Sequence, residues 1–410
     1  MTNQSKFIAL ILTMTMNALS GQDTDHKLIA YTEAKVWNGK SFEQRDLFVQ
    51  KSLFVEANRS EADSIISLSG DYIVPPYGDA HTHNFGAGGY SIKIAEEDYL
   101  PAGVFYAMDL TNPYSEIKQV KDHFEKINTV DVMYTNGGIT STGSHPTGAM
   151  ERIFTDKEKI TLDNLELEGD AYWFIDNLED LDKKWSKIMA QEPDVLKIYM
   201  THVQKGLDKG ECYGLCPEVT KAVVDKANQA GIRVLAHINT KKDVQYALNA
   251  GVDGIAHIPS GNDNIKVNQK DFWLDQQLID KLGKARLIIT PTASLLIEDA
   301  DPEDLIEEIR KQKEQINALH ESGARLALGA DELRKTSIYE VMYFHKYNFF
   351  DNATLLNIFT KETSQAIFPN RKIGEINKGY EASFLVLKDN PIKDFEAIKK
   401  IKLGVKQGVK

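Results

Sequence analysis

The sequence predicts an α/β fold, a (β/α)8 TIM barrel with a small β-sandwich domain formed by the N- and C-terminal segments. In the middle of the chain, short apolar runs alternate with helical segments, which is typical of repeated βα units around a parallel sheet. Toward the two ends of the chain, short strand-like runs are instead separated by turn residues. A chain of 410 residues with 42% hydrophobic content can bury one large core and a small companion domain.

The two end segments are predicted to form the β-sandwich together. Their expected strands are Lys35–Trp37, Leu47–Val49, Ser64–Leu68, Ser383–Leu387 and Ile401–Val405. Turn residues such as Asn38-Gly39 and Ser69-Gly70 separate the N-terminal runs. Neither segment is long enough for a stable core of its own, so we expect residues 22–74 and 367–410 to pair, and residues 75–366 to form the barrel.

Eight strand candidates fall in the barrel segment. They are Tyr72–Val74, Val104–Met108, Val132–Tyr134, Val195–Tyr199, Arg233–Ala236, Gly254–Ala256, Leu287–Thr290 and Leu326–Leu328. The intervening helices carry recognisable ends: Pro217 suits a first helical position and Gly231 a C-terminal cap, while Thr240 and Gly251 bracket the next helix.

The first 21 residues are predicted to be a secretory signal peptide. Lys6 supplies a positive start, Phe7 to Ala18 a short apolar stretch, and Ala18-Leu19-Ser20 a small-residue cleavage pattern. A buried N-terminal helix is the alternative. The signal predicts an exported protein, periplasmic or secreted, and the stretch is too short for a stable membrane anchor.

The charge of the chain limits its partners. A net charge of −12 argues against nucleic acid and anionic membranes, because both would be repelled. It weakly favours neutral or cationic small-molecule substrates. The sequence leaves the oligomeric state open, a homo-oligomer included.

Only two cysteines occur, Cys212 and Cys216. In an oxidising compartment they could close a small disulfide ring, and two free thiols are the alternative. The spacing is a poor zinc signature, because no second pair of soft ligands follows it.

Six residues share a placement near the carboxyl ends of predicted strands, where barrel enzymes build their active sites. They are His81, His83, Lys197, His237, His257 and Asp331. His81 and His83 are two positions apart, so their side chains point the same way and can hold one metal ion together.

Lys197 lies within an apolar strand, where an unpaired ammonium would be costly to bury. A salt bridge to a carboxylate is one explanation. The other is that the neutral amine takes up carbon dioxide and becomes a carbamate that bridges two divalent ions. The four histidines favour the carbamate.

With these residues the chain resembles the metal-dependent amidohydrolase superfamily, and within it the imidazolonepropionase-like and prolidase-like groups of exported bacterial enzymes. The resemblance covers nearly the whole mature chain. It rests most specifically on the Lys197 strand and on four segments, Gly78-Asp79-Ala80-His81-Thr82-His83, Gly251 to His257, Gly329-Ala330-Asp331, and Gly374 to Ser383.

The resemblance implies a role for each candidate. His81, His83 and Asp331 would bind the more buried of two divalent ions, by default Zn²⁺, His237 and His257 the more exposed ion, and carboxylated Lys197 would bridge them. A metal-bridging hydroxide would attack a carbon–nitrogen bond of amide, peptide-like or cyclic amide type, with Asp331 as general base and then acid. The implied enzyme is an amidohydrolase such as a dipeptidase or an N-acyl amino acid hydrolase.

Two further residues are candidates for substrate binding. His145, in the loop Gly137 to His145 after strand three, resembles a substrate-contacting position of prolidase-like relatives. Tyr199 shares the inward face of its strand with Lys197, and barrel packing is the alternative for it. We expect four other histidines, His123, His202, His320 and His345, to lie at the surface.

Departures from the family pattern leave the substrate open. Relatives of the prolidase group often read Glu-His-Gly at strand six, whereas this chain reads Ala256-His257-Ile258. Deaminases place a glutamate three positions after the strand-five histidine, where this chain has Thr240. A lactonase or ester hydrolase could use the same metals and is the alternative function; a deaminase or a non-catalytic scaffold fits the residues less well.

Overall fold

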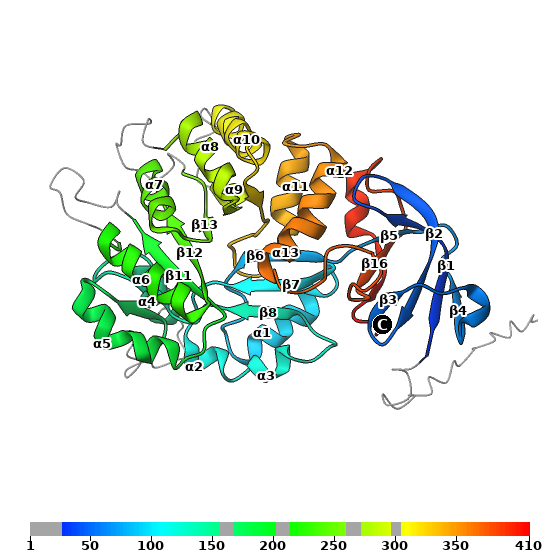
Figure 1. Ribbon diagram of the computed structural model, residues 1–410, viewed down its shortest axis with the longest axis horizontal. Helices are drawn as coiled ribbons and strands as arrows, with labels where there is room; N and C mark the ends of the chain where they lie inside the picture. Colours follow the sequence, from blue (N-terminus) through cyan, green and yellow to red (C-terminus); the bar gives the residue numbers. More distant parts are fainter. Residues whose placement is uncertain (1–26, 156–166, 202–213, 260–271, 297–304) are drawn as a thin grey trace, which may run out of the picture.

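The computed structural model describes residues 27–155, 167–201, 214–259, 272–296 and 305–410. It has a large α/β body and, at one end, a smaller sheet built from the first and last described strands (Figure 1). The predicted signal peptide lies outside the described residues. Among the helices of the described segments, none combines the length and the apolar character needed to cross a bilayer.

The smaller sheet has seven strands in the order β17-β16-β5-β1-β2-β3, with β4 beside β1. The strands are β1 Ile29–Trp37, β2 Phe42–Gln50, β3 Leu53–Val55, β4 Ser64–Ser67, β5 Tyr72–Val74, β16 Phe384–Leu387 and β17 Ile401–Val405. Antiparallel pairing of β5 with β16 joins the two ends of the fold, as predicted. Tyr31 and Phe384 stack edge to face at 4.9 Å in its core. The domain boundaries at residues 74 and 367 remain predictions.

The larger body contains two sheets of parallel strands, β6-β7-β8 and β10-β9-β11-β12-β13-β14-β15. The strands are β6 Tyr77–Thr82, β7 Val104–Asp109, β8 Asp131–Tyr134, β9 Gly138–Thr140, β10 Tyr172–Phe174, β11 Val195–Met200, β12 Arg233–Ile238, β13 Gly254–Ala256, β14 Ile288–Thr290 and β15 Arg325–Leu326. Backbone hydrogen bonds link the two sheets, from Ala80 N in β6 to Leu328 O after β15 (2.7 Å) and from Asp194 N just before β11 to Tyr134 O in β8 (2.9 Å). These links are barrel-like, and one continuous closed sheet remains a prediction.

The prediction for strand one was wrong. Tyr72–Val74 is β5 of the smaller sheet, and the first strand of the α/β body is β6, after Pro75 and Pro76. The prolines separate two strands that belong to different sheets. The hydrophobicity pattern does not predict β6, because Asp79, His81 and Thr82 are polar, although every residue of the strand is buried.

The expected loop after strand three also begins with a strand, β9. Gly138 fits there because a Cβ at this position would lie 2.5 Å from the ring of Tyr199. β10, which pairs with β9, was missed as well.

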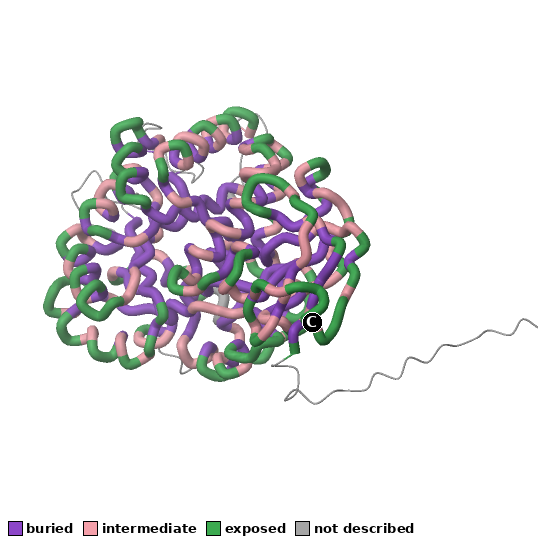
Figure 2. The backbone as a smooth tube through the Cα atoms, turned by 45° about the vertical axis from the view of Figure 1, so that its right-hand side comes forward, coloured by how far each residue is buried: buried purple, intermediate pink, exposed green. Residues whose placement is uncertain are grey.

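Helices cover the outside of the parallel sheets, and Figure 2 shows buried backbone concentrated inside and exposed backbone on the outer helices. The α-helices are α1 Gly89–Ile94, α2 Tyr114–Ile117, α3 Lys121–Phe124, α4 Thr147–Thr155, α5 Leu178–Met189, α6 Pro217–Ala230, α7 Lys241–Ala250, α8 Gln276–Ala285, α9 Ala293–Leu296, α10 Leu305–Glu321, α11 Ile338–Lys346, α12 Asn352–Asn357 and α13 Thr363–Ile367. Single turns of other helix types are η1 Arg59–Glu61, η2 Ala95–Tyr99, η5 Ile358–Glu362 and η6 Phe395–Lys399.

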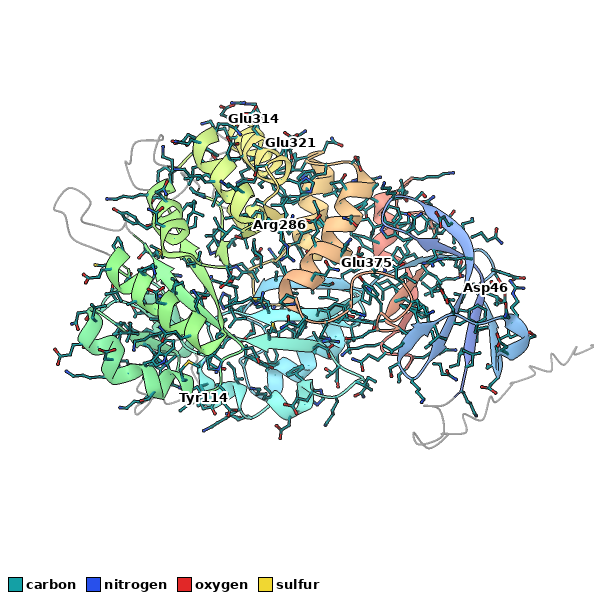
Figure 3. All side chains as sticks on the ribbon, viewed as in Figure 1. Asp46, Tyr114, Arg286, Glu314, Glu321 and Glu375 are labelled. Atoms are coloured by element: carbon teal, nitrogen blue, oxygen red, sulfur yellow. The ribbon has the colours of Figure 1, made fainter. Side chains whose placement is uncertain are left out.

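The predicted ends of α6 and α7 are confirmed. Pro217 begins α6, and Gly231 ends it in a left-handed conformation. Thr240 accepts a hydrogen bond from Asp243 N at the start of α7, and Gly251 ends that helix. Acidic side chains such as Glu314 and Glu321 on α10 project from the outer surface (Figure 3), in keeping with the net negative charge.

Candidate metal centre

His81 and His83 converge on Asp331. His81 lies in β6 and His83 just after it, while Asp331 follows β15. The Nε2 atoms of His81 and His83 lie 3.2 Å and 3.0 Å from Oδ1 of Asp331. Backbone pairing supports this meeting, because Asp331 N donates to His81 O at 2.9 Å.

His257 and His237 come from the neighbouring strands. Nδ1 of His257 lies 3.7 Å from Oδ2 of Asp331. The ring centroid of His257 is 4.9 Å from that of His81 and 4.6 Å from that of His237. One ligand atom each from His81, His257 and Asp331 fall within 4.8 Å of one another, which suits a single metal ion.

Lys197 lies in β11 beside these residues, with a side chain that is 1% exposed. Its Nζ makes no hydrogen bond to the residues that the structure describes. Burial lowers the pKa of Lys197 to about 7, although the charge of Asp331 raises it. The salt bridge considered from the sequence is absent from the described ion pairs, so the buried amine has no compensating partner there.

Burial and charge set the protonation of the site. Burial alone would raise the pKa of Asp331, but the surrounding histidines bring it well below its usual value. Burial lowers the pKa of His81 to about 4 and holds those of His237 and His257 well below normal. At neutral pH the site therefore presents the Asp331 carboxylate and neutral imidazoles at His81, His237 and His257, the forms that bind divalent metals. His83 differs: burial lowers its pKa, but the hydrogen bond and the charge of Asp331 outweigh burial and raise that pKa above its usual value.

Hydrogen bonds orient three of the imidazole rings. Nδ1 of His83 lies 3.2 Å from Thr111 O, and since a carbonyl only accepts, the proton sits on Nδ1. Nε2 of His237 lies 3.1 Å from Oδ1 of Asn239, and Nδ1 of His257 lies 2.6 Å from Oγ1 of Thr292. In His237 and His257 the contact leaves the other ring nitrogen to accept, which is the usual way a protein prepares a histidine ligand. In His83 the other nitrogen, Nε2, faces Oδ1 of Asp331 at 3.0 Å.

Backbone strain gathers at the same place. His257, Asp331, Thr111 and Thr292 have φ values of 74°, 55°, 67° and 46°. Residues other than glycine rarely adopt this left-handed backbone conformation, and for a β-branched residue such as threonine it costs more free energy than for most others. Two of the four are predicted ligands, and the two threonines contact predicted ligands.

His145 also reaches the site. Its ring stacks on that of His237 at 4.7 Å and contacts Tyr199 edge to face at 5.2 Å. Burial lowers the pKa of His145 to about 4, so it is neutral at physiological pH. Its loop is fixed by Thr140 Oγ1, which donates to His145 O at 2.6 Å.

Tyr199 faces the site from β11, with its ring 5.5 Å from Nζ of Lys197. Its hydroxyl donates to Oγ1 of Thr111 at 2.7 Å. The hydroxyl of Tyr199 is therefore engaged within the protein.

Two buried carboxylates were missed by the sequence reasoning. Asp79, two residues before His81, accepts hydrogen bonds from His81 N, Tyr99 Oη and Ser337 N. Asp109 ends β7 and accepts from Phe85 N and from Nδ2 of Asn112. Burial raises their pKa values to about 7 and about 6. The available signal was their position, inside the Gly78–His83 motif and at the carboxyl end of a predicted strand.

His123, His320 and His345 do not join the site. These three histidines are half-buried, and they contact the aromatic rings of Phe124, Phe350 and Phe395 respectively. His202 and Cys212 lie outside the described residues, so the proposed disulfide with Cys216 stays a prediction.

The residues present fit a divalent metal centre. Three protein ligands with nitrogen and oxygen donors converge, further imidazoles lie next to them, and a buried amine without a described partner stands at the edge. Such a donor set is typical of zinc and of other first-row divalent ions.

Comparisons with known proteins agree with this architecture. The model of the Amidohydrolase family matches residues 72–410. No curated protein matches the chain in sequence. Solved structures similar to it include a Xaa-Pro dipeptidase with bound methionine, with a TM-score of 0.71, 17% identity and coverage of 93% of this chain and 99% of that one.

Two other solved structures show a comparable likeness. Ochratoxinase from A. niger has a TM-score of 0.73 and 15% identity, covering 94% of this chain and 95% of its own. A putative prolidase from Bifidobacterium longum has a TM-score of 0.72 and 18% identity, covering 93% of this chain and 94% of its own. At these identities the likeness establishes the fold alone.

Proposed function

The chain belongs to the amidohydrolase family and is a hydrolase acting on carbon–nitrogen bonds, and we propose that it cleaves an amide, peptide-like or cyclic amide bond at a binuclear metal centre. The observation that carries the proposal is the convergence of His81, His83 and His257 on Asp331 beside the buried Lys197. The names of the similar structures, a dipeptidase, a prolidase and an ochratoxinase, support an amide-type substrate.

We propose that His81, His83 and Asp331 hold one divalent ion and that His237 and His257 hold a second. Lys197 would bridge them as a carbamate. The buried Nζ without a described hydrogen-bond partner supports this role, because carboxylation would give it two oxygens for which positive charge is the natural partner. Zinc is our default for this donor set. The ions, when bound, would activate a water at neutral pH and polarise the substrate carbonyl.

Asp331 is the proposed general base and acid. Its pKa is held well below normal, so its carboxylate is ionised at neutral pH, the form that a general base needs before it takes up a proton. The same carboxyl group would then return the proton to the departing amine. His145 is the proposed ligand of the substrate carbonyl oxygen or of its carboxylate, because its neutral ring lies against His237 and Tyr199.

Of the two substrate-binding candidates, the structure favours His145 over Tyr199. The hydroxyl of Tyr199 is committed to Thr111, so we assign Tyr199 mainly to holding the site together. His145 remains the stronger candidate for substrate contact.

The first test is a hydrolysis screen of the purified protein with zinc and bicarbonate. The panel spans N-acyl amino acids, dipeptides including Xaa-Pro, cyclic amides and lactones, with Asp331→Ala as the inactive control. Turnover of an amide that is lost in the control supports the proposal. Turnover confined to lactones would overturn it in favour of an ester hydrolase.

Metal content tests the binuclear centre separately. We expect two equivalents of zinc in the wild-type protein and at most one in Lys197→Met, which keeps the volume of the side chain but cannot be carboxylated. Far-ultraviolet circular dichroism checks that the variant is folded. Equal metal content in both proteins would contradict the bridging role of Lys197.

A further inference from the structure

A buried carboxylate on α11 holds a turn that lies next to the metal centre. Glu340 is fully buried, and its Oε1 and Oε2 accept hydrogen bonds of 2.8 Å from Ala293 N and Ser294 N. These amides lie at the start of α9, a helix of four residues with too few internal bonds to fix its own first turn. The carboxylate supplies acceptors for both amides from a different segment of the chain.

The same turn contains the strained residue Thr292. Its φ of 46° is unusual for a β-branched residue, so the surrounding contacts must impose it. The two amides that Glu340 binds belong to the next two residues of the chain. Glu340 therefore acts on the backbone at the point where the conformation of Thr292 has to be maintained.

Thr292 determines which nitrogen of His257 carries the proton. The hydroxyl of Thr292 donates its single proton to Pro291 O at 2.9 Å. Its oxygen is 2.6 Å from Nδ1 of His257. With the hydroxyl proton donated to Pro291 O, this oxygen accepts and Nδ1 carries the hydrogen, a tautomer that the Asp331 carboxylate, 3.7 Å from the same nitrogen, also favours. Nε2 is thereby left as the accepting nitrogen of the ring.

We infer that Glu340 is a positioning residue for the metal centre, which fixes the turn Pro291–Ser294 so that Thr292 sets the tautomer and orientation of His257. This rests on the proposed function, in which His257 is a metal ligand. Glu340 makes no contact of its own with His257 in the described structure and acts through Thr292. Partners that bind a metal ligand directly, as Thr292 binds His257, commonly change metal affinity by about 10- to 100-fold when they are removed.

The experiment uses Glu340→Gln, Thr292→Val and the double variant. Tyr343→Phe is the matched control, because Tyr343 lies one turn along α11 and its buried hydroxyl donates to Gln312 (2.7 Å), away from the turn. The affinity for zinc is measured by competition with a chromophoric chelator. We expect each of Glu340→Gln and Thr292→Val to weaken binding at least 10-fold and Tyr343→Phe to leave it unchanged.

Coupling between the two positions separates positioning from general destabilisation. If Glu340 acts through Thr292, the two substitutions are not additive. The zinc affinity of the double variant then equals that of whichever single variant has the lower affinity. Additive losses, or wild-type zinc affinity in Glu340→Gln, would overturn the inference.

A second measurement does not depend on metal binding. Nitrogen-15 spectra of histidine-labelled, metal-free protein report the tautomer of His257, with His257→Gln identifying its signals. We expect hydrogen on Nδ1 in the wild type and in Tyr343→Phe, and a mixture of tautomers in Glu340→Gln and Thr292→Val. An unchanged tautomer in Glu340→Gln would refute the positioning role, whereas failure of the proposed function appears separately, as a wild type that binds no zinc or hydrolyses no amide.

Discussion

The hydroxyl of Tyr199 donates a hydrogen bond of 2.7 Å to Oγ1 of Thr111. The two residues lie in β11 and just after β7, and Thr111 also supplies the carbonyl that accepts from Nδ1 of His83. Tyr199 thus supports the residue that orients a predicted metal ligand. A tyrosine that points into an active site does not have to bind substrate.

This contact predicts the behaviour of Tyr199→Phe. Loss of the buried hydrogen bond should lower the free energy of unfolding by about 1–3 kcal/mol, and kcat should fall while KM changes little. The control is Tyr134→Phe, because the buried hydroxyl of Tyr134 makes no hydrogen bond to the described residues, and its removal should not destabilise the protein. Urea unfolding and steady-state kinetics check both variants; a large rise in KM with unchanged stability would instead place the Tyr199 hydroxyl on the substrate.

Arg371 predicts a strong link between the α/β body and the smaller sheet. Its guanidinium donates to Oδ2 of Asp131 at 2.8 Å and to both carboxylate oxygens of Glu381 at 2.8 and 2.6 Å. Arg371→Gln should cost about 1.5–3 kcal/mol, because the partly buried Glu381 loses its guanidinium partner, whereas Asp131 keeps its contact with Lys406. Arg310→Gln, which breaks exposed pairs on α10, should leave the urea midpoint nearly unchanged, because solvent screens those pairs. Equal urea midpoints for the two variants would show that the Arg371 cluster contributes no more than a surface pair.

Glu340 predicts a pH dependence of stability. Burial raises the pKa of Glu340 from 4.5 to about 7 in the folded protein, although its hydrogen bonds lower it. Between these values the folded state binds more protons at this group than the unfolded state does, so its contribution to stability falls as pH rises from about 4.5 to 7.

The corresponding measurement compares wild type with Glu340→Gln by urea unfolding at pH 5 and pH 8. The free energy of unfolding of the wild type, relative to the variant, should decrease by on the order of 3 kcal/mol between the two pH values. A difference that stays constant with pH would mean that Glu340 titrates near its ordinary value.

The expected export of the protein is testable at its N-terminus. When the full chain is produced in a Gram-negative host, we predict a periplasmic product that begins near Gly21, after cleavage at Ala18-Leu19-Ser20. N-terminal sequencing and fractionation check this. An uncleaved product that begins at Met1 and stays in the cytoplasm would favour a buried N-terminal helix.

The sequence was most informative where local chemistry determines the outcome. The ends of α6 and α7 follow from Pro217, Gly231, Thr240 and Gly251, because capping depends on the residue at one position. The convergence of His81, His83 and His257 on Asp331 also follows from strand ends that meet at one edge.

Other features depend on contacts that no local pattern encodes. Periodicity did not show that Tyr72–Val74 pairs with β16, since that choice is made by a distant partner. The left-handed backbone of Thr111 and Thr292 could not be anticipated either, because threonine avoids it unless tertiary contacts impose it. The use of Glu340 as an acceptor for the amides of Ala293 and Ser294 is tertiary in the same sense.

The pairing of β5 with β16 also governs how the chain can fold during synthesis. β1 to β5 leave the ribosome first, but β16 and β17 follow only after the whole α/β body has been made. Until then the β5 edge has unpaired amides and carbonyls, which are open to association with other chains. Because the contact joins segments so distant in sequence, its loop-closure entropy makes it a late and slow step. The smaller sheet therefore ties completion of the native state to the arrival of the last strands, and a chain arrested before them would be prone to aggregate.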